Sequence, residues 1–327
     1  MTPDDEARIS EFNAALDGEL SLRLHLPDDS RAGELNAFSK RLTQLASKIA
    51  AQVVKDGTGT HPAILVGPRL VYHSVPSDRE LEPFLRALSY LNSNSTEIDS
   101  SMAQILEDVH LPAELRIYVV PSCPFCPGVL QQLLPLPFAV PALQLTVVDG
   151  MLFPELAEQD TIQSVPTVIL DDAFRWTGQI ALSDIIDTLI HRDPARLKQS
   201  TLQRLLLDEK EGAYRLAAMM DSRKMIFPAF YDLLLEETFT IRLAAMVAME
   251  ALAEENITLA QTALPTLLNR FNDAPDPVKG DLLYILGELK SGSAKPFIEA
   301  VVEGNYAEEI KEAAQEALET LQGEESS

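Results

Sequence analysis

The sequence predicts an α/β region built from two similar units, followed by a region made only of helices. Up to about residue 192, short apolar runs with strand-like alternation are separated by stretches whose apolar residues recur at helical spacing. The order of these elements occurs twice within that region. Beyond it, apolar residues recur only at helical spacing. We therefore expect three segments, residues 1–112, 113–192 and 193–327.

Residues 1–112 begin the first unit with a strand, because Leu20, Leu22 and Leu24 alternate with polar side chains. Asp28-Asp29-Ser30 then supplies a turn and a helix cap. A helix, a strand, a hairpin and a closing helix follow at residues 38–45, 49–54, 64–72 and 81–88. Together these elements amount to a small α/β unit.

Residues 113–192 repeat that order of elements. Strands are expected at 115–120, 143–148 and after Pro166, and helices at 129–134, 153–159 and 182–189. His61-Pro62-Ala63-Ile64-Leu65-Val66 of the first unit aligns with Val165-Pro166-Thr167-Val168-Ile169-Leu170 of the second. The alignment favours an internal repeat of one unit.

The only cysteines of the chain, Cys123 and Cys126, flank Pro124 and Phe125 directly after an apolar run. A strand that delivers Cys-x-x-Cys to the start of a helix is how thiol–disulfide oxidoreductases present a reactive pair. Pro166 opens a second apolar run about forty residues later, where thioredoxin-like folds place a cis-proline that faces the cysteines. We therefore expect two tandem thioredoxin-like units, the first redox-inactive because Asp28-Asp29-Ser30 lies where its cysteine pair would be.

The expected chemistry gives each cysteine its own role. Cys123 is expected at the N-terminus of a helix, where free backbone N–H groups favour a thiolate, so it is the candidate nucleophile. Cys126, one turn deeper, would displace the product from the mixed disulfide, while Pro166 shapes the groove. Pro124 suits the first helical turn. The candidate substrate contacts flank these catalytic positions: Pro124, Phe125, Val165 and Thr167.

The residues between the cysteines favour one direction of electron flow. A strong oxidant often carries a histidine there to stabilise the thiolate, and Phe125 cannot do so by charge. A reducing or shuttling role is therefore expected over disulfide formation. Two other classes stay open, namely a disulfide-forming oxidase and a scaffold whose cysteine pair is a relic or a redox switch.

Residues 18–192 resemble the N-terminal domain of the alkyl hydroperoxide reductase flavoprotein subunit and are similar to the protein disulfide oxidoreductases of thermophiles. Three blocks carry the resemblance: Ser122-Cys123-Pro124-Phe125-Cys126-Pro127, Val148-Asp149-Gly150-Met151-Leu152-Phe153 and Val165-Pro166-Thr167-Val168. The resemblance implies that one cysteine pair passes electrons from a flavin and nicotinamide module to the disulfide of a peroxiredoxin. No Gly-x-Gly-x-x-Gly occurs in this sequence, so no bound cofactor is expected and a separate flavoprotein reductase would supply the electrons.

The resemblance also implies a proton acceptor for Cys126, because the related tandem proteins carry a glutamate in the last helix of the first unit. Glu80 falls at the matching place. A carboxyl in a half-buried cleft has a raised pKa and can serve as a general base. The alternative is a surface glutamate in the first turn of a helix.

Residues 193–327 carry segments that recur at spacings in the thirties, beginning at Ile241, Val278 and Ile310. These segments resemble HEAT-like helical-pair repeats, which carry an aliphatic–basic dipeptide on a helix rich in Ala and Leu; a plain helical bundle is the alternative. Helical repeats expose extended surfaces, so we expect this region to dock a redox partner. Residues 323–327 should be disordered.

Charge and composition exclude several classes of function. The net charge of −24 argues against nucleic acid as a partner, because phosphate would be repelled. No apolar stretch reaches the roughly 18 residues typical of a membrane span. The acidic N-terminus resembles neither a signal nor a transit peptide, so a cytoplasmic protein is expected. The five histidines lack metal-ligand spacing and two cysteines are too few for a typical site, so no metal is expected.

Overall fold

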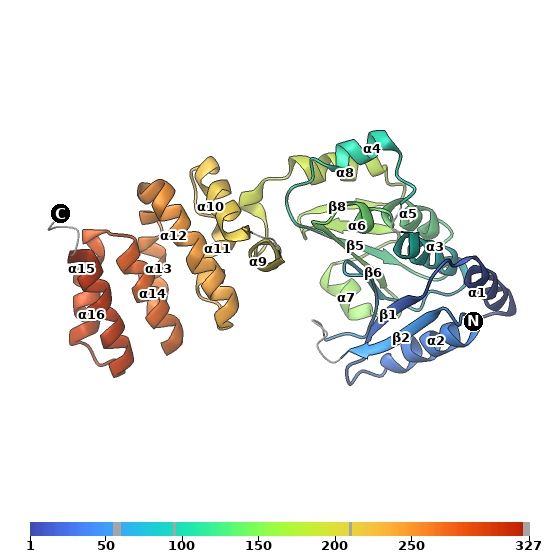
Figure 1. Cartoon of the computed structure of the whole chain (residues 1–327), viewed down its shortest axis with the longest axis horizontal. Coiled ribbons are helices and arrows are strands. Elements are labelled where there is room, and N and C mark those ends of the chain that lie inside the picture. The colour runs from blue at the N-terminus through green and yellow to red at the C-terminus, as the bar shows by residue number, and fades with distance from the viewer. Residues whose placement is uncertain (55–59, 94–95, 209–210, 323–327) are drawn as a thin grey trace. The chain divides into compact units, whose positions relative to one another are not determined.

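The computed structural model describes residues 1–54, 60–93, 96–208 and 211–322 (Figure 1). The chain divides into two compact units, Met1–Arg192 and Asp193–Ser327, which we describe separately. The tail at 323–327, for which we expected disorder, lies outside the described residues.

One mixed sheet organises the first unit. Within the described residues the sheet has eight strands in the order β2-β1-β3-β4-β6-β5-β7-β8. In each half, the first strand pairs in parallel with the second and antiparallel with the third, and the third pairs antiparallel with the fourth. This repeat confirms the predicted α/β class with two tandem thioredoxin-like halves. The strands are β1 (Leu20–His25), β2 (Ile49–Val54), β3 (Ala63–Val66), β4 (Leu70–His73), β5 (Ala113–Val119), β6 (Leu143–Asp149), β7 (Thr167–Leu170) and β8 (Phe174–Thr177).

The two halves share the sheet through the parallel pairing of β4 with β6, in which Tyr72 lies opposite Val147. Because β1 and β4 both run antiparallel to β3, and β4, β6 and β5 run in parallel, these four strands point the same way. Their carboxyl ends therefore meet at one edge of the sheet, which we call the redox edge because Cys123 follows β5 there.

Helices cover both faces of the sheet. Side chains alternate between the two faces along each strand, so each face has apolar residues that need covering. On β5, Ile117 joins the main core, which includes buried residues of α2 (Ala32–Leu45), α3 (Leu81–Ser93), α5 (Cys126–Leu133) and α8 (Leu182–His191). Its neighbour Tyr118 points the other way and packs with Val148, Phe153 and Ile169. The short helix α7 (Pro154–Gln159) belongs to that second face (Figure 1).

The helix cap that we expected at Asp28-Asp29-Ser30 is wrong in detail. The N-cap of α2 is Arg31, and no side chain caps the helix there. Asp29 instead accepts a hydrogen bond from the backbone N–H of Arg31 at 2.8 Å, so the acidic run shapes the turn before the helix.

Three helices of the first unit were not predicted from the sequence: α1 (Pro3–Ala15), α4 (Ser100–Leu106) and α6 (Leu136–Ala139). In α1, a capping box joins Thr2 to Asp5, with each side chain accepting the backbone N–H of the other residue at 3.2 and 2.8 Å. Ile9 is fully buried and anchors α1 to the core.

The second unit is helical throughout its described residues, as predicted. The segments beginning at Ile241, Val278 and Ile310 lie in α12, α14 and α16. Asn256 interrupts α12 at φ −149° and ψ 79°, and its Oδ1 accepts the N–H of Leu259 at 3.1 Å, which caps the part that follows. The helices are α9 (Gln199–Asp208), α10 (Gly212–Arg223), α11 (Pro228–Leu234), α12 (Phe239–Gln261), α13 (Leu264–Phe271), α14 (Asp276–Glu288), α15 (Lys295–Glu303) and α16 (Glu308–Gln322).

A buried arginine ties neighbouring helices of the second unit together. Arg242 on α12 is 3% exposed, and its Nε donates to Asp281 Oδ2 on α14 at 2.6 Å. Its guanidinium also donates to the carbonyl of Glu237 at 3.0 Å. Across both units, none of the described helices is long and apolar enough to cross a lipid bilayer.

Candidate redox site

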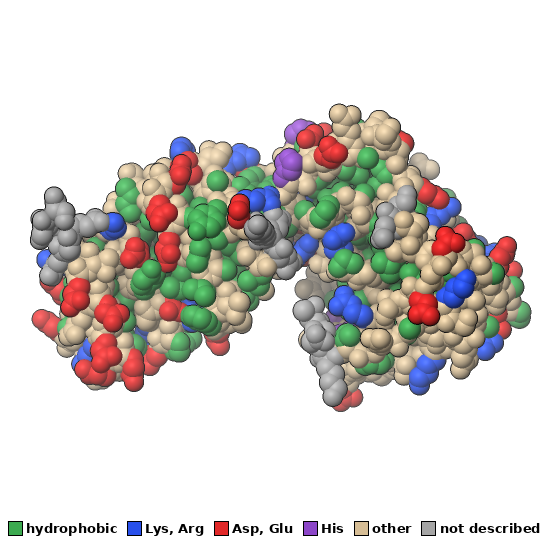
Figure 2. Space-filling model, in the orientation of Figure 1, with side chains coloured by type: hydrophobic (Ala, Val, Ile, Leu, Met, Phe, Trp, Pro, Cys, Tyr) green, Lys and Arg blue, Asp and Glu red, His purple; other side chains and the backbone are tan. Residues whose placement is uncertain are grey.

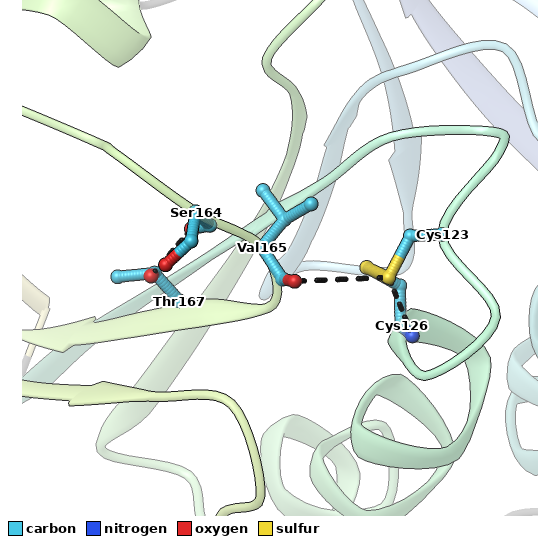
Figure 3. The surroundings of a disulfide bond; sticks show 5 residues. All are labelled: Cys123, Cys126, Ser164, Val165 and Thr167. Carbon is cyan, nitrogen blue, oxygen red and sulfur yellow. Dashed lines mark hydrogen bonds between the residues drawn. A yellow bond between two sulfur atoms is a disulfide. The ribbon is translucent and has the colours of Figure 1, made fainter.

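The two cysteines form a disulfide at the redox edge (Figure 3). Cys123 lies in the turn that leaves β5, and Cys126 is the first residue of α5, with their Cα atoms 5.6 Å apart. The backbone N–H of Cys126 donates to Cys123 Sγ at 3.0 Å. Cys123 is 6% exposed and Cys126 is fully buried. The sulfur of Cys123 is therefore the more accessible of the pair.

The helix after the cysteines begins later than we expected. Phe125 is the N-cap of α5, so Pro124 precedes the helix and Pro127 takes the place in the first turn. Proline suits that turn because the first N–H groups of a helix have no partner within it. The N–H of Cys126, in the first turn, is directed toward Cys123 Sγ, and the positive end of the helix favours a thiolate there.

The turn that carries Pro166 lies against the disulfide through the residue before the proline. The Val165–Pro166 peptide bond is cis, and the carbonyl oxygen of Val165 lies 3.9 Å from Cys123 Sγ (Figure 3). Thr167 is less suited to contact a substrate, because its side chain is 2% exposed. Its hydroxyl donates to the carbonyl of Ser164 at 2.8 Å, so it shapes the turn that carries Pro166.

Glu80 lies inside the protein, in a turn of 3₁₀ helix (Asp78–Glu80) that leads into α3. The residue is 2% exposed, and Ser74 Oγ donates to its Oε2 at 3.0 Å. Burial raises the pKa of Glu80 to about 7, the hydrogen bond from Ser74 opposes this, and the charge of Asp149 adds to it. The alternative of a surface glutamate is therefore wrong.

The strand order places Glu80 near the cysteines. Its partner Ser74 directly follows β4, and Cys123 follows β5, with β6 between these two strands. Two strand spacings correspond to about 10 Å. Glu80 also precedes α3, which packs against α5 on the same face of the sheet. A carboxyl that titrates near neutral pH therefore lies on the side of the sheet that carries Cys126.

Sequence reasoning missed the polar residues around Glu80. Asp149 ends β6, is 6% exposed, and accepts the backbone N–H groups of Met151 and Leu152 at 2.9 and 3.3 Å. Burial raises the pKa of Asp149. Asp149 lies in one of the blocks that carry the resemblance but was given no role in the site, although an Asp at the carboxyl end of a parallel strand is a signal for a site at that edge.

Exposed apolar side chains lie next to the cysteines in the chain or on the same edge of the sheet. Phe125, between the cysteines, is 67% exposed, and Met151, after β6 on the same edge, is 71% exposed. Pro121 and Pro124 are also exposed, and Val165 is half-buried. We call Phe125, Met151, Pro121 and Pro124 the apolar rim. A rim of this kind offers contact area to a polypeptide that approaches the sulfur.

An arginine occupies the matching edge of the first half. The guanidinium of Arg31, in the turn after β1, lies 4.3 Å from the centre of the Phe153 ring and forms an ion pair with Glu155. It also donates to the carbonyl of Leu152 at 3.3 Å. Arg31 Nε also donates to Asp29 Oδ1 at 2.8 Å, and the hydrogen bond from the Arg31 side chain is the chief reason why the pKa of Asp29 is lowered to about 2. At this edge the first half has no cysteine, and its turn instead contacts the second half through Arg31.

Metal ligation has no evident place in the part of the chain that the structure describes. There, no group of three or more His, Cys, Asp or Glu side chains is arranged to hold a metal ion.

Comparison with known proteins identifies the region around the cysteines. Residues 113–191 match the family model of the thioredoxin domain. The chain is 20% identical over 194 residues to an NADH dehydrogenase of Ferdinandcohnia aciditolerans, covering 58% of this chain and 37% of that protein. It is likewise 20% identical over 194 residues to the F subunit of alkyl hydroperoxide reductase of Staphylococcus epidermidis, covering 58% and 38%. The match thus spans little more than a third of these relatives.

Two solved structures share the fold of the first unit. The N-terminal domain of the alkyl hydroperoxide reductase F subunit of Enterococcus faecalis aligns with a TM-score of 0.50 and 22% identity, covering 58% of this chain and 99% of that one. A protein disulfide oxidoreductase from Aeropyrum pernix aligns with a TM-score of 0.52 and 13% identity, covering 60% and 95%. The first unit therefore has a tandem thioredoxin-like fold, and the part of it that carries Cys123 and Cys126 matches the thioredoxin domain model.

Proposed function

We propose that the chain is a thiol–disulfide oxidoreductase that reduces protein disulfides, or passes electrons between them, through Cys123 and Cys126. The observation that carries this proposal is the Cys123–Cys126 disulfide, held at the start of α5 opposite the cis-proline Pro166 in a thioredoxin domain. A scaffold would not need a reactive pair in this arrangement.

The reaction starts from the reduced pair. The thiolate of Cys123 attacks one sulfur of the substrate disulfide, and the first substrate thiolate leaves and takes a proton from water. Cys126 then gives its proton to Glu80 and attacks Cys123 Sγ, which breaks the mixed disulfide and releases the second thiolate. The second thiolate takes from Glu80 the proton that came from Cys126, so Glu80 is ionised again. The substrate has then gained two electrons from the cysteines and two protons, one from water and one from Cys126, and the enzyme is left with the Cys123–Cys126 disulfide.

The geometry supports this division of roles. Cys123 is the more exposed cysteine, and its sulfur accepts the N–H of Cys126 at the positive end of α5, which favours its ionised form. Cys126 is fully buried and must lose its proton without direct contact with water. Glu80, with a pKa of about 7, is matched to accept that proton near neutral pH.

A protein substrate suits the surface around the sulfur better than a small disulfide does. Phe125 and Met151 are among the most exposed large apolar side chains of the first unit. A small disulfide would leave most of this apolar rim in water, whereas a polypeptide can cover it. Phe125 supplies no charge to stabilise the thiolate, which favours a reductant or shuttle over a disulfide-forming oxidase.

A flavoprotein reductase is the electron donor that we propose, and the disulfide of a peroxiredoxin is one acceptor. Relatives of the first unit include the F subunits of alkyl hydroperoxide reductases, which supports partners of this chemistry. A reducing compartment such as the cytoplasm would keep the pair ready for such a cycle.

The helical unit would hold one of these partners. Tyr214 on α10, Leu243 on α12 and Tyr284 on α14 are 59%, 43% and 46% exposed and offer apolar contact area to a partner. Acidic side chains gather over the end formed by α15 and α16 (Figure 2). A partner with a basic face would therefore be attracted, and binding should weaken as salt rises. A partner held nearby reaches Cys123 at a higher effective concentration.

Reduction of insulin, or of a small aromatic disulfide, with dithiothreitol as the donor tests the proposed activity. The wild-type protein should turn over, Cys123→Ser should be inactive, and Cys126→Ser should accumulate a mixed disulfide that captures the physiological partner. No turnover with any disulfide would favour a scaffold. A potential close to that of strong oxidants, measured in glutathione buffers, would favour an oxidase.

A further inference from the structure

Two buried polar atoms near Glu80 have no partner among the described residues. They are the hydroxyl oxygen of Tyr72 and Oε1 of Glu80 itself. Tyr72 is fully buried and Glu80 is 2% exposed, so neither atom can rely on bulk water. A buried polar atom without a partner is destabilising, so two of them beside one ionisable group call for a functional explanation.

The local geometry brings these two atoms to one place. Tyr72 and Ser74 are two residues apart along β4 and its extension, so their side chains leave the sheet on the same face. Ser74 binds Oε2 of Glu80. Phe84, which follows Glu80 by four residues, packs edge-on against the Tyr72 ring with centroids 5.3 Å apart. Glu80 and Phe84 thus lie on one helical face, above Ser74 and Tyr72.

We infer that Tyr72 is a positioning residue for Glu80, with its hydroxyl donating a hydrogen bond to Oε1, directly or across one water molecule, when Glu80 is ionised. This rests on the proposed role of Glu80 as the base for Cys126. Ser74 would then donate a hydrogen bond to one carboxylate oxygen of Glu80 and Tyr72 to the other. Glu80 can then hold a negative charge inside the protein between turnovers, which it needs in order to accept the next proton.

The electrostatic environment agrees with this placement. The charge of Glu80 contributes to a raised pKa of Tyr72, after burial, so the phenol stays protonated and remains a donor. Asp149, at the end of β6, opposes ionisation of Glu80. Cys126, the first residue of α5, lies on the same side of the sheet as Glu80. The other charged residues nearby, on the turn that carries Glu80 and on α1, line a surface hollow: Asp78, Arg79, Asp4, Asp5 and Arg8.

Tyr72→Phe removes only the hydroxyl and keeps the ring that Phe84 contacts. In the full-length oxidised protein, the ¹³C signal of the Glu80 carboxyl can be identified by its absence in Glu80→Gln and followed against pH. We expect its midpoint to rise by about one pH unit in Tyr72→Phe, since a hydrogen bond to a charged group is lost. The midpoint should rise again when Ser74→Ala is added.

Tyr118→Phe is the matched control. Tyr118 is also a buried tyrosine on a central strand, but it points to the other face, where its hydroxyl donates to Asp160 at 2.6 Å. Its loss should leave the Glu80 midpoint unchanged. An unchanged midpoint in Tyr72→Phe would overturn the inference, because the titration does not depend on turnover. A shifted midpoint in a protein that reduces no disulfide would instead keep the contact and remove the proposed function.

Should Tyr72→Phe fail to fold, Tyr72 can be replaced by 3-fluorotyrosine, whose phenol is more acidic and donates more strongly. The Glu80 midpoint should then fall below that of the wild type. A midpoint that stays the same or rises would contradict the inference.

Discussion

The backbone N–H of Cys126 points at the sulfur of Cys123 from 3.0 Å, so the resolving residue helps to prepare the attacking one. The same main-chain group can donate to the Cys123 thiolate when the pair is reduced, and it adds to the positive end of α5. The difference in exposure, 6% against none, acts in the same direction.

Alkylation of the reduced protein should therefore label Cys123 before Cys126. At neutral pH, iodoacetamide should modify Cys123 at least about tenfold faster, because only a thiolate reacts and a buried thiol ionises poorly. Peptide mass spectrometry after timed quenching gives both rates. A faster reaction at Cys126 would reverse the assignment of nucleophile and resolving cysteine.

Stability should depend on pH through Glu80. The folded protein holds its proton up to a pKa of about 7, whereas the unfolded chain loses it near 4.5, so folding is favoured less as pH rises between these values. Glu80→Gln has no ionisable group at this position, so it lacks this contribution to the pH dependence of stability. Relative to the wild type, its free energy of unfolding should rise by about 3 kcal/mol between pH 4.5 and pH 7 and then level off.

Urea denaturation of Glu80→Gln and wild type at a series of pH values measures this difference. The fluorescence of Trp176 reports the first unit alone, since it is the only tryptophan and lies on β8. A difference that does not change with pH would mean that Glu80 is ionised normally in the folded protein.

The apolar rim should matter for protein substrates and not for small ones. Phe125→Ser and Met151→Ser should each raise KM for a protein disulfide by about tenfold, because each removes a large apolar contact. Reduction of a small aromatic disulfide should change by less than about twofold. Val53→Ser is the control, since Val53 is 60% exposed on β2, away from the cysteines. Equal losses in all three variants would contradict a local role.

A buried ion pair should be important for the stability of the first unit. Arg192 Nε lies 3.5 Å from Asp171 Oδ2, with both side chains at most 3% exposed, and Arg192 also donates to the carbonyl of Pro112 at 2.6 Å. Arg192→Met leaves a buried carboxylate without its cation and should cost about 3–5 kcal/mol. Arg41→Met breaks an exposed pair with Glu6 and should cost less than about 1 kcal/mol. Urea denaturation, monitored by the fluorescence of Trp176, measures the loss of stability in each variant.

A chain that ends at Arg192 should keep its fold and its reaction with small disulfides, because the first unit has its own core. It should work poorly on the protein partner captured with Cys126→Ser, and the loss should be largest at low salt, where acidic helices attract most strongly. Steady-state rates at two salt concentrations measure this. Equal rates for both chain lengths would remove the docking role of the helical unit.

The local pattern of apolar side chains predicts most of the helices and strands. The surroundings of Glu80 were missed because they depend on pairing between strands far apart in the sequence. Leu20–His25 and Ile49–Val54 were readable as strands because their side chains suit a pleated surface, and the stripe from Leu81 to Leu88 was readable as a helix. Helix α1 was missed because its face is mostly polar, although Thr2, Pro3 and Asp5 carry a capping signal. The sequence could predict that Cys123, Cys126 and the turn with Pro166 lie together, because their motifs and spacing are typical of one fold.

The surroundings of Glu80 could not be read in the same way. Its contact with Ser74 and its position beside Tyr72 and Asp149 depend on the pairing of β4 with β6, which joins residues more than seventy apart. No periodicity along the chain encodes that pairing, because both strands alternate buried and half-buried side chains over most of their length, a pattern that would suit several neighbouring strands.

The parallel pairing of β4 with β6 also has a consequence for how such a protein can change over evolutionary time. Because β1 and β5 point the same way, the turn that holds Asp29 and Arg31 opens on the redox edge, and Arg31 reaches Leu152 and Glu155 beside it. The copy without sulfur is released from the demands of electron transfer. Substitutions in its turns can therefore alter the surface at this edge without changing Cys123 or Cys126, provided that Arg31 and its contacts with the second half are kept.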